Sequence, residues 1–326
     1  MILPYSIRLV CLCLASFFLL HAVLGLATWL AAPAALRLAE KMPARRAARF
    51  LFFLRLIPAV LAAIVVLGVG VPSYMWLEPQ ATEESVGLAC FVAAALGVAI
   101  WSISIARVVH AAIRTSRFAW QYKRMGREIT REGAAIPASV LDVDVPVIAL
   151  AGVLQPRVLI SRSVLGVLSS AELDAALRHE NAHRESWDNL KRFAILLAPG
   201  IFPLTGGLGA LERAWARFSE WAADDEATRG DARLSLLLAA ALVHVARLGA
   251  APQPSLALTP LIAGDRDLAT RVDRLLRGEA QTPERGWQVG AMLGCLAVLG
   301  SAGLAFALEW AAILRTVHVL LERLVG

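Results

Sequence analysis

The sequence predicts a mainly helical membrane protein, in which multi-pass membrane helices are joined to a cytoplasmic α+β domain with a small sheet. Hydrophobic residues make up 58% of the 326-residue chain. Several charge-free apolar runs are long enough to cross a bilayer. Between them lies a polar segment in which short aliphatic runs are followed by helical patterns. This composition excludes an ordinary soluble globular protein.

Four apolar runs are predicted to span the membrane, because about 20 apolar residues are needed to cross ~30 Å of hydrocarbon. They lie near 9–32, 50–72, 86–106 and 287–309. All four cysteines fall within these runs, which argues against a disulfide framework and against metal binding by thiolates. We therefore expect three spans in 1–107, a separate domain in 108–286, and a fourth span with a short amphipathic tail in 287–326.

Basic residues predict the orientation of these spans. The loop between the first two spans is basic, whereas the loop before the third contains only acidic charges. The positive-inside rule then places the first loop and the 108–286 domain in the cytoplasm and both chain ends outside. The net charge of +6 is explained by this orientation, so we expect no nucleic-acid partner. Arg55 lies inside the second run, and we expect it to snorkel to the cytoplasmic surface.

The polar segment begins with signals for strands and then for a helix. Val145–Leu150 and Arg157–Ile160 are aliphatic runs separated by turn residues, which predicts a short hairpin or small sheet. Ser169 with Glu172 three residues later is a capping box, and apolar residues at helical spacing predict a helix to about Lys191.

Two further helices are expected after this one. A polar helix is predicted at about Leu211–Arg229, and a buried helix, too short to span comfortably, at Leu234–Arg247. The intervening Phe193–Leu211 is apolar but interrupted by proline and glycine, so it is a poor spanning helix.

The helix after Ser169 carries His179-Glu180-Asn181-Ala182-His183, an H-E-x-x-H pattern. Four-residue spacing puts both imidazoles on one helix face, one turn apart. Their ring nitrogens can bind one Zn²⁺, while Glu180 lies beside the metal as a base that activates water. The alternative is that both histidines are ordinary surface residues and Glu180 is one more solvated charge.

A catalytic zinc site needs a third protein ligand, and Glu220 in the next polar helix fits. Asp224 shares its helical face and can accept a hydrogen bond from the far ring nitrogen of a ligand, for which we favour His179. The competing interpretation is that both carboxylates belong to a solvated acidic stretch. Because ligands of one metal must share a compartment, 193–211 cannot cross the bilayer once, and should be re-entrant, interfacial or buried against other helices.

These motifs resemble a known family. The H-E-x-x-H pattern, the block Arg184–Leu190 and the pair Glu220…Asp224 resemble the membrane-bound zinc metallopeptidases of the β-lactam-sensor and antirepressor type. More distantly they are similar to the HtpX and CAAX-prenyl-protease metallopeptidases, which share H-E-x-x-H and a Glu-x-x-x-Asp helix. The resemblance covers most of the chain and implies a zincin-like domain of the gluzincin class, with Asp188 and Arg271 as candidate supporting residues.

One departure from the family limits what the resemblance implies. The sensor-type proteins carry a large extracellular penicillin-binding domain after the last span, whereas this sequence ends shortly after its fourth predicted span. We therefore do not expect this polypeptide to sense β-lactams directly.

The motifs and the resemblance together predict a zinc endopeptidase of the cell (inner) membrane, acting in regulatory proteolysis at the cytoplasmic face. Its expected partners are the lipid bilayer, a peptide or protein substrate such as a cytoplasmic repressor or a membrane protein, and a second copy of itself. A strand near 145–160 is a candidate sheet edge for an extended substrate. Four residues remain candidates for stabilising the oxyanion, the negatively charged oxygen that forms on the substrate carbonyl during attack by water: Tyr122, Arg217, His244 and Arg271.

Three alternatives remain. The first is a quality-control protease like HtpX, which the sequence does not separate from a regulator. The second is a non-catalytic pseudo-peptidase scaffold, although such a scaffold needs no general base. The third is a transporter or channel, which is disfavoured because the spans contain almost no paired polar residues and the informative motifs lie outside them.

Overall fold

The protein is described from a computed structural model. The described residues are 4–77, 87–129, 138–142, 145–153, 156–200, 207–249, 258–260, 265–278, 315–317 and 319–320. They are mostly helical, with one small mixed sheet, as the predicted fold class requires. The predicted span at 287–309 lies outside the described residues.

Three helical stretches are long and apolar enough to cross a membrane, and they coincide with the first three predicted spans. They are α1 (Tyr5–Ala39), the continuous stretch Ala44–Leu77 formed by α2 (Ala44–Val65), η1 (Val66–Gly70) and α3 (Val71–Leu77), and the part Leu88–Thr115 of α4 (Leu88–Met125). These helices indicate a membrane protein.

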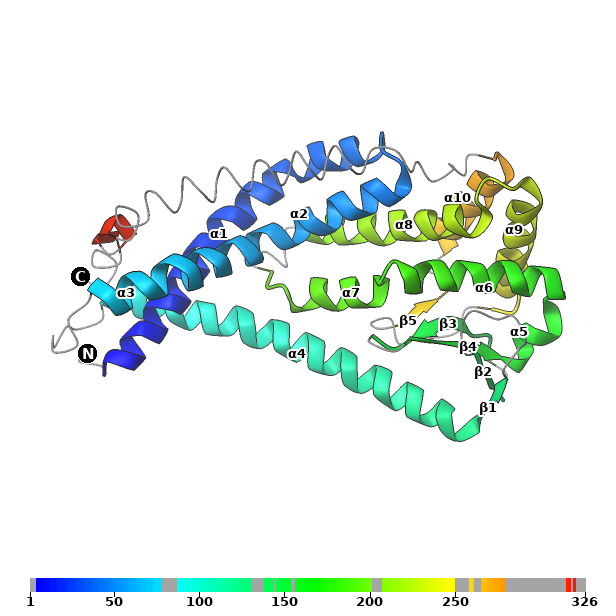
Figure 1. The fold of residues 1–326 in the computed structure, drawn as a ribbon, viewed down its shortest axis with the longest axis horizontal. Coiled ribbons are helices and arrows are strands. Elements are labelled where there is room, and N and C mark those ends of the chain that lie inside the picture. Colours follow the sequence, from blue (N-terminus) through cyan, green and yellow to red (C-terminus); the bar gives the residue numbers. More distant parts are fainter. Residues whose placement is uncertain are drawn as a thin grey trace.

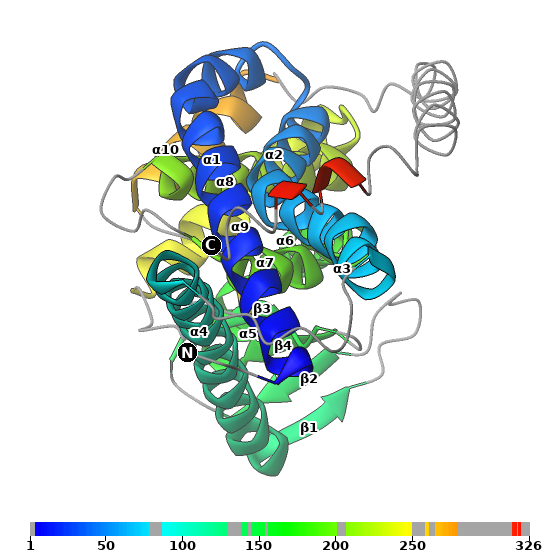
Figure 2. The same ribbon diagram turned by 90° about the vertical axis from the view of Figure 1, so that its left-hand side faces the viewer.

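The membrane helices alternate in direction. In Figure 1 the end of α1, the start of α2 and the end of α4 all lie toward the part of the molecule that carries the sheet. Figure 2 shows α1 between α2 and α4, and it packs against both. Helix α4 continues to Met125, so one uninterrupted helix passes the boundary predicted at residue 107.

The sheet has the strand order β1-β2-β4-β3-β5, formed by β1 (Gly126–Ile129), β2 (Ala138–Leu141), β3 (Ile148–Ala151), β4 (Arg157–Ser161) and β5 (Leu258–Pro260). The predicted hairpin is confirmed, since β3 and β4 pair antiparallel with Ile148 opposite Ile160. The prediction of a sheet edge near 145–160 is wrong, because β3 is also paired with β5 and β4 with β2. Among the described residues, the edges are β1 and β5.

The remaining helices are α5 (Arg162–Val167), α6 (Ser170–Glu185), α7 (Asp188–Leu197), α8 (Gly207–Thr228), α9 (Ala232–Arg247) and α10 (Asp265–Leu276). Helix α6 begins with the predicted capping box, in which Ser169 Oγ accepts from the Glu172 amide and Glu172 accepts from the Ser169 amide. Apolar residues of β3 and β4 form one core with α6 and α9, including Ala176 and Leu238. The predicted buried helix at Leu234–Arg247 is confirmed as α9.

The prediction that the helix beginning after Ser169 continues to about Lys191 is wrong. Helix α6 ends at Glu185, Trp187 adopts a left-handed conformation with φ of 57°, and α7 begins at Asp188. Helices commonly end in this conformation on glycine, which has no Cβ to strain, but here the residue is tryptophan, so the sequence contains no such signal. The break turns Asp188 back toward His183.

Helix α8 packs closely against the membrane helices. Its Leu211, Trp215 and Phe218 share a buried cluster with alanines of α1 and α2, among them Ala39 and Ala47. Small side chains on the membrane helices allow this close approach. Helix α8 therefore connects the membrane part of the molecule with its polar part.

Arg55 does not snorkel, contrary to the sequence prediction. It is 1% exposed, and its Nε donates to Glu212 Oε1 of α8 at 2.8 Å. Its Nη2 donates to the Ala198 carbonyl at 3.2 Å, and His21 Nε2 of α1 lies 3.1 Å from the Pro199 carbonyl oxygen. Of the three arrangements predicted for 193–211, burial against other helices is the one found in its described part.

Candidate metal centre

The two motif histidines lie on the buried face of α6. Both side chains are fully buried, and their Nε2 atoms are 3.1 Å apart. The capping box fixes the start of this helix, and Ala176 packs it against the sheet, so the imidazoles are held on a rigid element. His179 and His183 therefore lie on one face of the helix, one turn apart, as predicted.

Helix α8 brings the third candidate ligand to the same point. Glu220 Oε2 lies 3.5 Å from His179 Nε2, and Glu220 Oε1 lies 3.6 Å from His183 Nε2. Ligand atoms placed tetrahedrally at ~2.0–2.1 Å from a metal are about 3.3 Å from one another. The buried group of His179, His183 and Glu220 can therefore hold a metal ion.

The far ring nitrogens of both histidines meet carboxylates. His183 Nδ1 donates to Asp188 Oδ2 at 2.8 Å, and His179 Nδ1 lies 2.9 Å from Asp224 Oδ1. The predicted pairing of His179 with Asp224 is thus found. With the His183 Nδ1 proton donated to Asp188, the Nε2 atoms of the two histidines lie 3.1 Å apart, a separation at which they can share a proton or bind one metal ion. The donor chemistry therefore fits a divalent metal.

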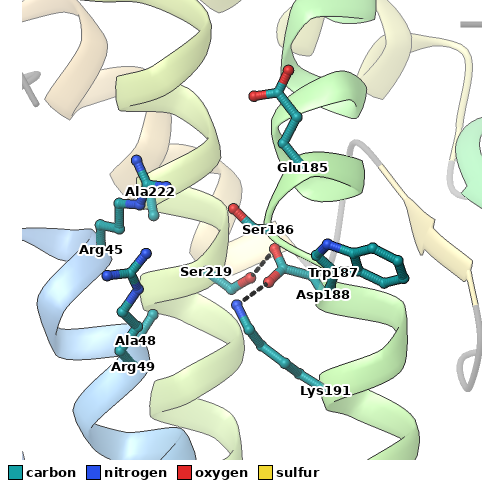
Figure 3. Close-up of a pocket in the computed structure, with 10 residues that line it drawn as sticks. All are labelled: Arg45, Ala48, Arg49, Glu185, Ser186, Trp187, Asp188, Lys191, Ser219 and Ala222. Carbon is teal, nitrogen blue, oxygen red and sulfur yellow. Dashed lines mark hydrogen bonds and ion pairs between the residues drawn. The ribbon is translucent and has the colours of Figure 1, made fainter.

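Asp188 is held in place by three donors. Besides His183, Ser219 Oγ donates to its Oδ2 at 2.7 Å and Lys191 Nζ to its Oδ1 at 3.1 Å (Figure 3). Burial alone would raise the pKa of Asp188, but the hydrogen bond and charge of His183 and the charge of Lys191 hold it below its usual value. Asp188 therefore stays ionised and fixes the orientation of the His183 ring.

When no metal is bound, His183 carries a proton at the position of the metal. Burial would lower the pKa of His183, but the charge of Glu220 and the hydrogen bond that His183 donates to Asp188 outweigh burial and raise it to about 10. The pKa of Glu220 lies well below its usual value, because the charges of His183 and Arg271 overcome the opposing effect of burial. A metal ion would replace this proton on binding.

Glu180 is a carboxylate of the site whose burial is not offset by any hydrogen bond from the described residues. It is fully buried, and neither of its oxygens has a hydrogen-bond partner among the described residues. Burial raises its pKa to about 7, although the charges of His179 and His183 oppose the increase. A carboxylate with a pKa near neutrality can both take up and release a proton, as a general base and acid must.

Arg271 joins the two carboxylates of α8. Its guanidinium donates to Asp224 through Nε at 2.9 Å and Nη2 at 2.7 Å, and its Nη1 lies 3.0 Å from Glu220 Oε2. Burial would lower the pKa of Arg271, but Asp224 and Glu220 raise it above its usual value. The arginine of α10 therefore fixes the ligand Glu220 and the supporting Asp224 in one arrangement.

The structure separates the four candidates for oxyanion stabilisation. Arg271 lies at the site, with Nη2 3.4 Å from His179 Nε2. His244 Nδ1 lies 3.2 Å from Glu172, and Arg217 lies over the ring of Trp221. The side chain of Tyr122 lies outside the described part of the chain.

Three further residues position the site but were not singled out by sequence. Ser219 and Lys191 hold Asp188. Asn189 Nδ2 donates to the carbonyls of Leu150 at 3.1 Å and Gly152 at 2.7 Å, which fixes the start of α7 against β3. Polar residues next to a motif carry no distinguishing signal, so only the folded chain identifies their partners.

Comparison with known proteins does not assign the chain to a family. No protein-family model matches the chain, and no curated protein matches it.

Proposed function

We propose that the protein is a membrane-embedded, zinc-dependent endopeptidase whose metal is bound by His179, His183 and Glu220. One observation carries the proposal: a buried His-His-Glu group lies beside Glu180, a fully buried carboxylate with no hydrogen-bond partner among the described residues. An unpaired buried carboxylate is costly and has no packing role that an apolar residue would not fill better. This cost also argues against a non-catalytic scaffold.

The donor set favours zinc over other divalent ions. Two imidazoles and one carboxylate, with a fourth position left for water, form a ligand set typical of catalytic zinc sites. Calcium and magnesium prefer oxygen ligands alone. Asp188 and Asp224 make the two imidazoles better ligands through their Nδ1 atoms.

The chain's own residues supply proton transfer and positioning. A bound zinc ion would act as a Lewis acid that makes water more acidic and polarises a peptide carbonyl. Glu180 takes a proton from the attacking water and returns it to the departing amine nitrogen. The pKa of Glu180, raised to about 7 mainly by burial, matches both steps. Arg271 keeps Glu220 and Asp224 ionised and aligned.

The setting of the site favours regulatory proteolysis at the cytoplasmic face of the cell membrane. Basic residues at the ends of the first two membrane helices, including Arg37 and Arg45, support a cytoplasmic metal centre. The resemblance to sensor-type and antirepressor metallopeptidases supports a regulatory role with a repressor or a membrane protein as substrate. The second candidate is membrane-protein quality control, which the same site would serve.

The test is metal content and proteolysis of the full chain purified in detergent. Wild type should contain one zinc ion per chain and cleave an unfolded protein substrate. Glu180→Gln should keep the metal and lose cleavage, whereas the control Glu185→Gln, an exposed residue of the same helix, should keep both. Wild-type cleavage by Glu180→Gln would refute the proposed base. Wild type without metal after zinc loading would refute the metal site.

A further inference from the structure

A cavity of about 200 Å³ lies beside the metal centre, on the far side of His183 from Glu220. Three elements line it: the start of α2, the corner between α6 and α7, and α8. Asp188, which accepts the hydrogen bond from His183 Nδ1, forms part of its wall. Figure 3 shows Arg45 and Arg49 of α2 across the cavity from Asp188 and Lys191.

The basic side chains that line this cavity carry more positive charge than the acidic residues near them neutralise. Arg49 makes no hydrogen bond or ion pair with any described residue. Arg45 is half exposed, and the one acidic residue it reaches in the described part of the chain is Glu226, at 3.5 Å. Lys191 is 3.1 Å from Asp188.

The two acidic residues of the lining do not balance these cations. The Asp188 oxygens already receive donors from His183, Ser219 and Lys191. Glu185 accepts from Asn181 and lies at the far end of the cavity from Lys191 (Figure 3). The side of the cavity formed by Arg45 and Arg49 is therefore open to an anion.

The position of the cavity points to the membrane surface. Arg45 and Arg49 lie in the first turns of α2, where the apolar span begins. Trp187 lines the same cavity and is 56% exposed. Tryptophan is enriched at the headgroup level of a bilayer, and arginine is enriched in the cytoplasmic segments beside membrane helices. Basic pockets between membrane helices are suited to lipid headgroups.

We propose that this cavity is a binding site for a phosphate group, held by Arg45, Arg49 and Lys191. Arginine matches phosphate by bidentate hydrogen bonding, and a volume of about 200 Å³ suits a phosphate with a short polar alcohol. The source is the headgroup of an anionic phospholipid or phosphate in solution. The bound group connects the membrane helix α2 to α7, which holds Asp188. The site does not depend on peptidase activity.

The test compares phosphate-containing probes on the full chain in detergent. Short-chain phosphatidylglycerol, short-chain phosphatidylcholine and inorganic phosphate are titrated separately, and bound molecules are counted by native mass spectrometry. We expect one strongly bound phosphatidylglycerol per wild-type chain and a roughly tenfold or greater loss of affinity in Arg49→Gln, because a charge-assisted contact is removed. Arg45→Gln should show a similar loss.

Arg46→Gln is the matched control, since Arg46 has the same charge and lies on the same helix turn but does not line the cavity. It should bind as wild type does. Displacement of the lipid by inorganic phosphate at millimolar concentration identifies dissolved phosphate as the source; retention of the lipid identifies the headgroup. Equal affinity of wild type, Arg49→Gln and Arg45→Gln for every probe would overturn the proposal, as would an equal loss in Arg46→Gln. Unchanged helicity and metal content of the variants exclude misfolding as the cause of any loss.

Discussion

Helix α8 meets a buried arginine in each of its two halves, and the two arginines come from different parts of the chain. Near its start, Glu212 pairs with Arg55 of the membrane helix α2. Toward its end, Glu220 and Asp224 pair with Arg271 of α10. Both arginines are among the largest fully buried side chains of the described residues.

The two pairs differ in how their carboxylates are surrounded. Glu212 is 29% exposed, so water can hydrate it, and Arg55 also donates to the backbone carbonyls of Ile195 and Ala198 at the end of α7. Glu220 and Asp224 are buried and also contact the metal-binding histidines. The Arg55 pair therefore fixes where α8 lies against the membrane helices, whereas the Arg271 pair sets the charge of the metal centre.

The largest effect is expected from Arg271→Met. This change leaves two buried carboxylates without their cation, and breaking a buried ion pair in this way costs about 3–5 kcal/mol. Thermal unfolding of the metal-free protein in detergent should show the loss, and added zinc should restore part of it by supplying positive charge. Arg277→Met, an exposed change in the turn after α10, is the control. Equal stability of the Arg271 and Arg277 variants would contradict the assigned role.

Glu180→Gln is expected to stabilise the metal-free protein in a pH-dependent way. Burial raises the folded-state pKa of Glu180 from 4.5 to about 7. A raised pKa means that the stability from this group is full below pH ~4.5 and is lost as pH rises through about 7. At pH 8 the glutamine variant should therefore be more stable than wild type by on the order of 3 kcal/mol, and at pH 4.5 the difference should nearly vanish. Unfolding by denaturant at the two pH values measures it; a pH-independent difference would contradict the burial of an ionisable group.

Asp188→Asn is expected to weaken zinc binding by about 10- to 100-fold, because the supporting carboxylate of a histidine ligand is lost. Competition with a chelator of known affinity measures the change. Ser219→Ala removes only one donor to the same carboxylate and should have a smaller effect. A larger effect of the serine change would mean that Ser219 supports the centre by another route.

The smallest effect on the metal centre is expected when the ion pair between Arg55 and Glu212, near the start of α8, is removed. Arg55→Met should cost about 1–3 kcal/mol, because Glu212 can be hydrated once its partner is lost. Zinc affinity should stay within roughly twofold, as sites without shared contacts behave nearly independently. The double variant Arg55→Met/Glu212→Gln should recover part of the stability. A loss of zinc affinity as large as that of Asp188→Asn would show that the two halves of α8 are coupled.

Local patterns predicted much of the fold and of the site. Apolar runs identified the first three spans, and the capping box at Ser169 identified the start of α6. Spacing within α6 placed His179 and His183 together, and the need for a third ligand pointed to Glu220. The spans, the start of α6 and the histidine pair were predictable because each depends on a local sequence pattern, whereas Glu220 followed from the number of ligands that a catalytic zinc site needs.

Contacts between distant segments could not be predicted in the same way. Nothing in the sequence near Arg55 indicates a carboxylate at Glu212, and the left-handed Trp187 replaces the glycine that normally marks such a break. Strand β5 is only three residues long, so its pairing with β3 left no apolar pattern. These features depend on which surfaces meet after folding.

If His179, His183 and Glu220 bind one zinc ion, X-ray absorption at the zinc edge will show their ligand atoms. We expect one zinc per chain, with two imidazole nitrogens at ~2.0–2.1 Å, oxygen ligands, and no sulfur. This spectrum should be lost in Glu220→Ala. Sulfur coordination, or an unchanged zinc spectrum in Glu220→Ala, would show that the metal is bound elsewhere.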